Sequence, residues 1–296
     1  MQRQDLLIGL LVIIVWGLNF IAIKLGLQTM PPLLLGSLRF LLACVPAILF
    51  LPRPPIRWPW LIALGLSINV GQFAFLFLSM KVGMPAGLAS LLLQSQAFFT
   101  LFIAVLWLGE RLQWNHVVGL ILSVCGMTII GLQQEGTMTL TGFGLILIAA
   151  ACWGIGNIIM RQATVGVPNF SILSLVVWSG AVAILPLMML SLAIEGYDAW
   201  LTAFHSATWT TVSSVIYLAF FATLVGYGLW GKLLYRYPAA VVSPLALMVP
   251  LIGMSSSAMF LGESLSLSQA LGALLVMLGL AIHVFGRRWK TSTPST

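Results

Sequence analysis

Apolar stretches of about 20 residues recur along the whole chain, separated by short polar turns. Each stretch is long enough to cross the roughly 30 Å hydrocarbon core of a bilayer as an α-helix. Strands of a membrane barrel would instead alternate polar and apolar residues in segments of about ten. The pattern predicts an all-α integral membrane protein. Ten transmembrane helices are expected near residues 6–26, 32–51, 59–80, 86–107, 115–132, 140–160, 170–193, 209–231, 240–261 and 268–286.

The phrase Leu-Gly-Glu-x-Leu occurs twice, as LGERL around Glu110 and as LGESL around Glu263. Five predicted helices separate the copies, and an odd number of crossings places them on opposite sides of the membrane. This explains why Arg111 follows the first glutamate and Ser264 the second, because Lys and Arg are retained on the cytoplasmic side. The pattern predicts two inverted five-helix repeats. They cover residues 5–132 and 140–286, and a basic and polar tail follows at 287–296.

Further pairs of matching residues support the repeat. WGLNFIAIK, from Trp16, matches WGIGNIIMR, from Trp153. Fewer residues separate this pair than separate the two Leu-Gly-Glu copies, which predicts an insertion in the second half, in a loop at 195–208. Glycines seven residues apart occupy one face of the fifth helix and one face of the tenth. Such small faces let membrane helices approach closely, either between the halves or in a homodimer. The paired glycines are Gly119 and Gly126 with Gly272 and Gly279.

Charge is scarce and unevenly placed. Charged residues make up 6% of the chain, against about a quarter in soluble domains. The net charge of +7 does not predict a nucleic-acid partner, because the basic residues are dispersed among loops rather than gathered in a stripe. With the N-terminus in the cytoplasm, Lys24 and Lys81 fall outside, and ten basic residues fall inside. These ten are Arg3, Arg53, Arg57, Arg111, Arg161, Lys232, Arg236, Arg287, Arg288 and Lys290.

Polar residues inside the apolar stretches mark a candidate substrate site. Inverted-repeat transporters bind substrate near the midplane between the halves, and polar side chains are costly in lipid elsewhere. Amides, hydroxyls and indoles can hydrogen-bond a zwitterion or a polar neutral solute, although they also form hydrogen bonds between helices. In the fourth helix, Gln96 is expected to turn aside. The predicted substrate-binding residues are Trp16, Asn19, Asn69, Gln72, Gln94, Trp153, Asn157, Tyr227 and Ser243.

Three charged residues have two readings each. Arg39 lies inside the second apolar stretch and serves either as an anchor to carbonyl groups or as a charge near the transport pathway. Glu110 and Glu263 each follow a glycine suited to a helix C-terminus, so a structural role at the start of the next helix competes with a direct transport role. All six acidic residues lie at helix ends or in loops, so facilitated efflux or exchange is at least as compatible with the sequence as proton antiport, for which Glu110 or Glu263 could still serve.

Neither a metal site nor a cofactor is predicted. The three cysteines, Cys44, Cys125 and Cys152, all fall within apolar stretches and lack the spacing of a metal site or redox motif. A combination of nucleophile, base and metal facing a cavity is also missing from the sequence, so an enzyme is not expected.

Several long runs resemble the EamA branch of the drug/metabolite transporter superfamily. They include WGLNFIAIKLGLQTMPPLLLGSLRF, GQFAFLFLSMKVGMPAGLASLLLQSQAFF and YLAFFATLVGYGLWG. The resemblance spans about residues 5–290. It implies ten helices in a bacterial inner membrane, both termini in the cytoplasm, and a central cavity. It also implies export of small amino acids or their metabolites, with cysteine-pathway compounds such as O-acetylserine and cysteine as the best candidates.

Two other functions remain open. The many Trp, Phe and Met residues would suit a broad-specificity exporter of apolar drugs or metabolites, although any membrane core contains such residues. A non-transporting membrane scaffold would tolerate loss of the midplane polar residues, which separates it from a carrier experimentally.

Overall fold

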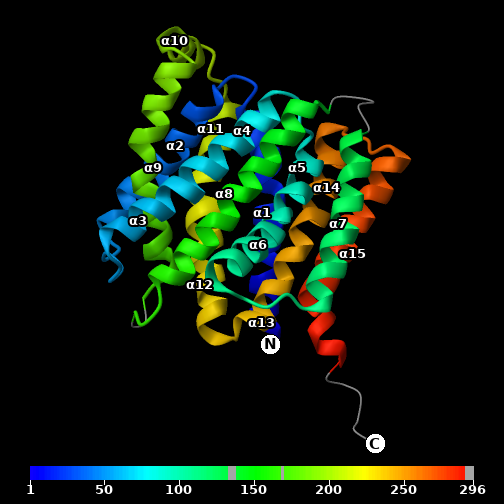
Figure 1. Ribbon diagram of the computed structural model, residues 1–296. Helices are drawn as coiled ribbons and strands as arrows, with labels where there is room; N and C mark the ends of the chain where they lie inside the picture. The colour runs from blue at the N-terminus through cyan, green and yellow to red at the C-terminus, as the bar shows by residue number, and fades with distance from the viewer. Residues whose placement is uncertain (133–137, 168–169, 291–296) are drawn as a thin grey trace, which may run out of the picture.

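The computed structural model describes residues 1–132, 138–167 and 170–290, and regular structure within them is helical. Some spans combine two or three helical segments end to end (Figure 1). The first half comprises α1 (Arg3–Gly26), α2 (Pro32–Ile48), α3 (Trp58–Leu64), η1 (Gly65–Gln72), α4 (Phe73–Lys81), α5 (Ala86–Leu92), η2 (Leu93–Ser95), α6 (Gln96–Leu108) and α7 (Trp114–Leu132). The second half comprises α8 (Leu140–Ala163), α9 (Ile172–Ile194), α10 (Tyr197–His205), α11 (Trp209–Ile216), η3 (Tyr217–Val225), α12 (Gly226–Arg236), α13 (Ala239–Val242), η4 (Ser243–Met248), α14 (Val249–Leu261) and α15 (Leu267–Lys290).

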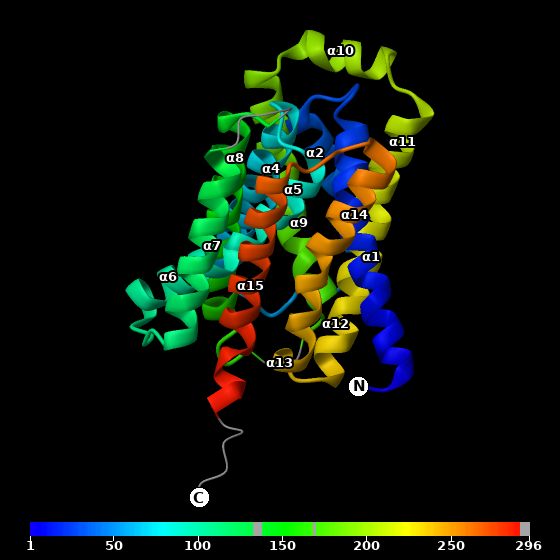
Figure 2. The same ribbon diagram turned by 90° about the vertical axis from the view of Figure 1, so that its right-hand side faces the viewer.

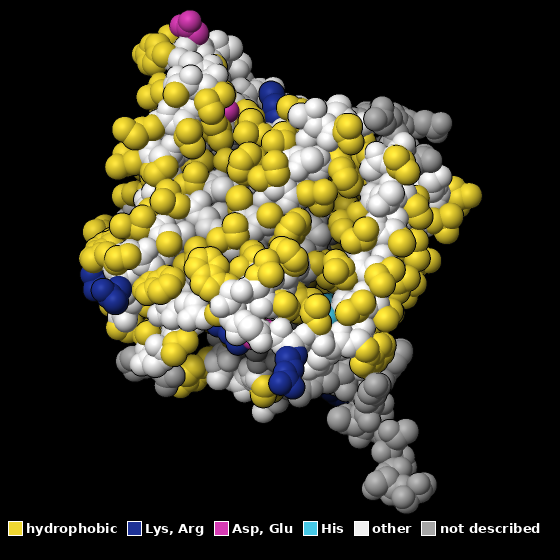
Figure 3. All heavy atoms as spheres, in the orientation of Figure 1, with side chains coloured by type: hydrophobic (Ala, Val, Ile, Leu, Met, Phe, Trp, Pro, Cys, Tyr) yellow, Lys and Arg dark blue, Asp and Glu magenta, His cyan; other side chains and the backbone are white. Residues whose placement is uncertain are grey.

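The ten predicted spans are all present as helices. Within the described residues, nine continuous helical stretches have the length and hydropathy to cross a membrane, and the shorter apolar helix α2 completes the set. Hydrophobic side chains cover the face shown in Figure 3, as expected for a surface in contact with lipid. The protein is therefore a multi-pass membrane protein. Of the predicted tail, residues 287–290 continue α15, and residues 291–296 lie outside the described part.

The two Leu-Gly-Glu phrases lie at opposite ends of the bundle (Figure 1). The turn between α6 and α7 lies at the end that carries the N-terminus, hereafter the N-terminal end, where α15 also finishes. The turn between α14 and α15 lies at the opposite end. Gly109 (φ 67°) and Gly262 (φ 66°) end α6 and α14 in the left-handed conformation that glycine adopts at little cost. The inverted arrangement of the repeats is confirmed.

The repeat extends to irregular winding that the apolar pattern did not predict. The π-helical segments η1 and η3 interrupt the third and eighth spans at matching positions of the two halves. The 3₁₀ segments η2 and η4 interrupt the fourth and ninth. Departures from α-helical winding redirect side chains and release backbone carbonyls, and they are frequent at functional sites.

The paired glycines lie where the two halves meet. Helices α7 and α15 pack along their length and run side by side in both ribbon views (Figures 1 and 2). A Cβ atom on Gly126 would lie 2.5 Å from the carbonyl oxygen of Gly272, and one on Gly279 would lie 2.5 Å from that of Gly119. Only glycine permits this approach, so these faces join the halves within one chain.

The segment 195–208 was predicted to be a loop, and this is wrong. It contains α10, which lies across the opposite end of the bundle (Figure 2). The indole N–H of Trp200 donates to Ser191 Oγ at 2.7 Å and ties α10 to the end of α9, whereas Tyr197 and Phe204 are exposed. The sequence pattern missed this helix because the segment is too short to span a membrane. Exposed aromatic residues beside polar ones are typical of a helix at the membrane surface.

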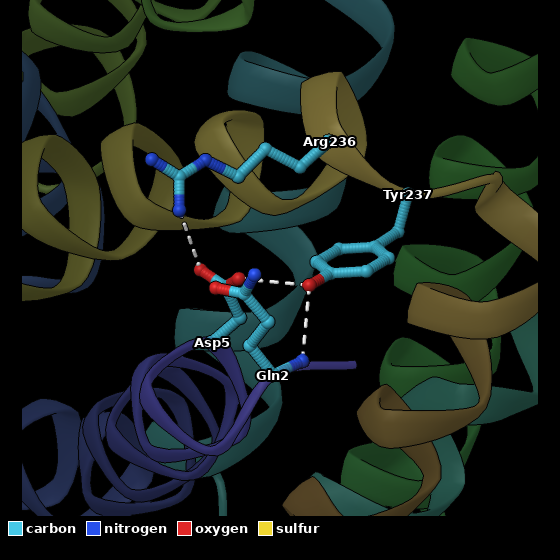
Figure 4. A network of polar contacts seen from close by, with 4 residues as sticks. All are labelled: Gln2, Asp5, Arg236 and Tyr237. Carbon is cyan, nitrogen blue, oxygen red and sulfur yellow. Dashed lines mark hydrogen bonds and ion pairs between the residues drawn. The ribbon is translucent and has the colours of Figure 1, made fainter.

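A polar network fastens the start of α1 to the end of α12 (Figure 4). The buried Asp5 carboxylate accepts hydrogen bonds from Arg236 Nη1 at 2.8 Å and from the Tyr237 hydroxyl at 2.8 Å. That hydroxyl also accepts from the backbone N–H of Gln2 at 3.0 Å. The first half is thereby linked to the second at the N-terminal end.

Candidate transport cavity

A cavity of about 560 Å³ lies between the two halves. Its size falls within the range of roughly 300–1,000 Å³ that is usual for small-molecule sites. The lining includes Ser90, which is 1% exposed, and Arg161, whose exposed side chain pairs with Glu110 at the N-terminal end. The cavity therefore opens toward the N-terminal end.

Eight of the nine predicted substrate-binding residues line this cavity. They come from α1, η1, η2, α8 and α12, which the repeat brings around one space. Ser243, at the start of η4, is exposed and is not part of the lining. The eight are Trp16, Asn19, Asn69, Gln72, Gln94, Trp153, Asn157 and Tyr227.

Two amides of the first half donate to the second half across the cavity wall. Asn69 Nδ2 donates to Ser179 Oγ at 3.1 Å, and Gln94 Nε2 donates to the carbonyl of Ala246 at 3.0 Å. The lining amides therefore also hold the halves in register, so the two readings of these residues, substrate contact and helix bridge, are compatible. Ser179 was not foreseen, because a single serine in an apolar stretch carries little signal.

The expectation that Gln96 turns aside is wrong. Gln96 lines the cavity, and its Oε1 accepts a hydrogen bond from Asn157 Nδ2 at 2.7 Å; the same amide donates to Thr100 Oγ1 at 3.0 Å. The reason is the 3₁₀ segment η2, which precedes Gln96 and turns by about 120° per residue rather than the roughly 100° of an α-helix. The side chain is thereby rotated toward Gln94.

One wall of the cavity is aromatic. The ring of Trp16 lies 5.1 Å from that of Tyr227 and 5.2 Å from that of Trp230, measured between centroids. The indole N–H of Trp16 donates to the carbonyl of Ala222, within the π-helical segment η3, at 3.0 Å. The polar edge of Trp16 is thus occupied, and it offers the cavity an aromatic face. Trp230 was missed, although its spacing of three residues from Tyr227 places both on one helix face.

Arg39 lies in the cavity wall and is 3% exposed. Its Nε donates to Thr223 Oγ1 at 3.1 Å and its Nη1 to Asn19 Oδ1 at 3.5 Å. The guanidinium carbon is 4.2 Å from the centre of the Phe73 ring. The acceptors are the hydroxyl of Thr223 and the side-chain amide carbonyl of Asn19, so both predicted roles of Arg39, an anchor to carbonyl groups and a charge near the transport pathway, stay predictions.

The two repeated glutamates have different surroundings. Glu110 forms an ion pair of 2.5 Å with Arg161 at the N-terminal end, where both side chains are partly exposed. Glu263 accepts hydrogen bonds from the backbone N–H groups of Ala86 and Gly87 at 2.7 and 2.9 Å. It therefore caps α5, in the other half, and not the start of the next helix as the sequence suggested.

Further contacts between helices accompany the Glu263 cap at the opposite end of the bundle. Lys24 Nζ donates to the carbonyl of Met80 at 3.3 Å, and Lys81 Nζ donates to that of Leu27 at 2.9 Å. Thr29 and Thr211 share a hydrogen bond of 2.6 Å between their hydroxyls. Charged and polar side chains thus link the helices at this end through hydrogen bonds.

An acid that the sequence analysis left without a role also acts at this end. Glu195 accepts hydrogen bonds from the backbone N–H groups of Leu33 and Leu34 at 2.8 and 3.3 Å, and from the hydroxyl of Ser191. It therefore stabilises the N-terminus of α2, where unpaired N–H groups and the helix dipole favour a carboxylate.

Inverted helical repeats around a mildly polar, one-sided cavity define the class of membrane transporters. The chain belongs to the EamA-like transporter family, which it matches over residues 4–132 and 140–285. It is 48% identical over 290 residues to a probable amino-acid metabolite efflux pump of Salmonella typhimurium, covering 97% of each chain. It is 45% identical over 293 residues to a probable amino-acid metabolite efflux pump of Escherichia coli, covering 98% of each. A solved crystal structure that is 18% identical superposes with a TM-score of 0.62, over 99% of this chain and 100% of that one, and supports the fold.

Proposed function

We propose that the protein exports small amino acids or amino-acid metabolites across the bacterial inner membrane by alternating access. The observation that carries the proposal is the cavity between the inverted halves, in which neutral amides, aromatic faces and Arg39 surround a space of about 560 Å³. Such groups suit a small polar or zwitterionic solute. The names of the two relatives with 45–48% identity support the same substrate class.

The placement of charge supports the proposed direction of transport. Arg3, Arg111 and Arg161 belong to the N-terminal end, and Lys24 and Lys81 to the opposite end. Under the positive-inside rule this distribution supports a cytoplasmic position for both termini and for the end at which the cavity opens. This state would load a cytoplasmic solute for export.

The best candidates for the substrate are O-acetylserine and cysteine. Purified protein in liposomes should release labelled O-acetylserine, cysteine or other small amino acids faster than empty liposomes do. The panel is measured with and without a pH gradient, which separates coupled from facilitated movement. Flux equal to that of empty liposomes for every amino acid of the panel would overturn the proposal.

A second candidate is broad export of apolar compounds. The wall formed by Trp16, Tyr227 and Trp230 favours it, because aromatic faces bind apolar and cationic molecules without regard to hydrogen-bonding pattern. This function would be favoured if the protein exported lipophilic dyes and an excess of small amino acids did not slow that export.

A further inference from the structure

Arg39 is a buried cation in the cavity wall. Among the described residues that line the cavity, none is Asp or Glu. Within the described part of the chain, the ion pairs formed by arginine are those of Arg161 with Glu110 and of Arg236 with Asp5. Among the described residues, Arg39 contacts the neutral oxygens of Thr223 and Asn19 and the rings of Phe40 and Phe73.

A purely structural role explains this arrangement poorly. Bridging Thr223 Oγ1 and Asn19 Oδ1 requires hydrogen-bond donors but no positive charge, and a charge inside a membrane carries a cost of several kcal/mol on any scale. Thr223 Oγ1 in turn donates to the carbonyl of Leu218 at 2.8 Å, so its lone pairs face the guanidinium. The two acceptors fix Arg39 in place while leaving its charge uncompensated.

A guanidinium held in this way suits a planar anion. Arginine has five N–H donors arranged to bind a carboxylate through two parallel hydrogen bonds. Among the described side chains, Thr223 and Asn19 accept hydrogen bonds from two of these donors. A carboxylate entering the cavity would supply the missing negative charge together with two further acceptors.

The other end of an amino acid has a complementary surface nearby. Trp16 lies three residues before Asn19 on one face of α1, and Asn19 is a partner of Arg39. The rings of Tyr227 and Trp230 flank Trp16. Aromatic faces attract ammonium groups without contributing a charge. One cavity thus pairs a cation with a cation-attracting aromatic wall.

We propose that Arg39 binds the free carboxylate of the transported solute, so that the protein selects amino acids and amino-acid metabolites whose carboxylate is unmodified. This inference rests on the proposed export function and narrows its substrate class. It predicts that converting the carboxylate to an amide or ester removes a compound from the substrate range, whereas acylation of its side chain is tolerated.

The test compares each transported amino acid with its primary amide in proteoliposomes. The wild-type protein should move the acid faster than the amide by about tenfold or more, the fold-change expected for a charge-assisted hydrogen bond. Arg39→Gln should slow the acid by a similar factor and abolish the preference, and Arg39→Lys should retain part of it. Arg53→Gln, which removes an exposed arginine outside the cavity lining, is the matched control and should keep the preference.

A binding measurement separates this inference from the export proposal. Purified protein is titrated with O-acetyl-L-serine and with its amide, and the fluorescence of the cavity tryptophans is recorded. Binding of the acid alone that is lost in Arg39→Gln supports the Arg39 inference, even where liposomes show no flux. Equal flux of acid and amide in the wild-type protein, or an unchanged preference in folded Arg39→Gln, overturns the inference and leaves export standing. If the wild-type protein neither transports nor binds any acid of the panel, both proposals fail.

Discussion

The carboxylate of Glu263 accepts a hydrogen bond of 2.9 Å from the backbone N–H of Gly87, across the boundary between the two halves. A second hydrogen bond, from Ala86, completes a two-point contact with the first turn of α5. A Cβ on Gly87 would lie 2.5 Å from Ser257 Oγ, so glycine is required for this close approach. The contact closes the end of the bundle opposite the cavity mouth.

Glu263→Gln should destabilise the protein more than Glu110→Gln does. The glutamine side chain keeps one acceptor oxygen, but its NH2 group faces a backbone N–H that the carboxylate oxygen had accepted from. That backbone N–H is left unpaired, and an unpaired buried donor costs about 1–3 kcal/mol. Glu110 instead forms an exposed ion pair with Arg161, and such pairs contribute roughly 0–1 kcal/mol. Thermal unfolding of both variants in detergent measures the difference. Equal melting temperatures would show that the Glu263 contact stabilises the protein no more than the Glu110 ion pair does.

Gly126→Ala should weaken the packing of α7 against α15. The new methyl group would lie 2.5 Å from the carbonyl oxygen of Gly272, and overpacking of this kind costs about 1–3 kcal/mol. Gly144→Ala is the matched control, because its Cβ would meet no atom within 4 Å. The expected result is a lower melting temperature for the first variant alone, with the same molecular mass in light scattering. A change of oligomeric state instead would assign the glycine face to a homodimer contact.

The sequence predicted the ten spans and their inversion because burial in lipid imposes long apolar runs, and because the charge bias differs between the two ends. It also identified eight lining residues and Arg39, since a polar residue in lipid is expensive wherever it does not face protein or water. It failed at Gln96 because the 3₁₀ turn before it has no hydrophobic signature. Similarly, the partner of Glu263 lies 177 residues away, in a helix that only the packing of the halves brings near.

Tyr237→Phe should loosen the start of α1. The change removes the hydroxyl that donates to Asp5 and accepts from the backbone N–H of Gln2. Hydrogen–deuterium exchange of residues 2–6 should accelerate by about fivefold, which corresponds to the roughly 1 kcal/mol contributed by one hydrogen bond. Tyr235→Phe, at a residue that is 84% exposed, is the control and should exchange like the wild-type protein. Unchanged exchange in Tyr237→Phe would mean that Arg236 alone holds Asp5.

Gln72 and Asn157 both line the cavity, but their substitutions should have different effects. Asn157 Nδ2 donates to Gln96 and Thr100 of the other half, so Asn157→Ala should lower both stability, by about 1–3 kcal/mol, and transport. Gln72, in the π-helical segment η1, lines the cavity, and its side chain forms no hydrogen bond with another described residue, so Gln72→Ala should reduce transport at nearly unchanged melting temperature. Efflux is measured at equal amounts of folded protein, together with thermal unfolding in detergent. A non-transporting scaffold would show no efflux above background, in the wild-type protein or in either variant. A stability loss in Gln72→Ala as large as that in Asn157→Ala would make Gln72 a bridge between helices rather than a substrate contact.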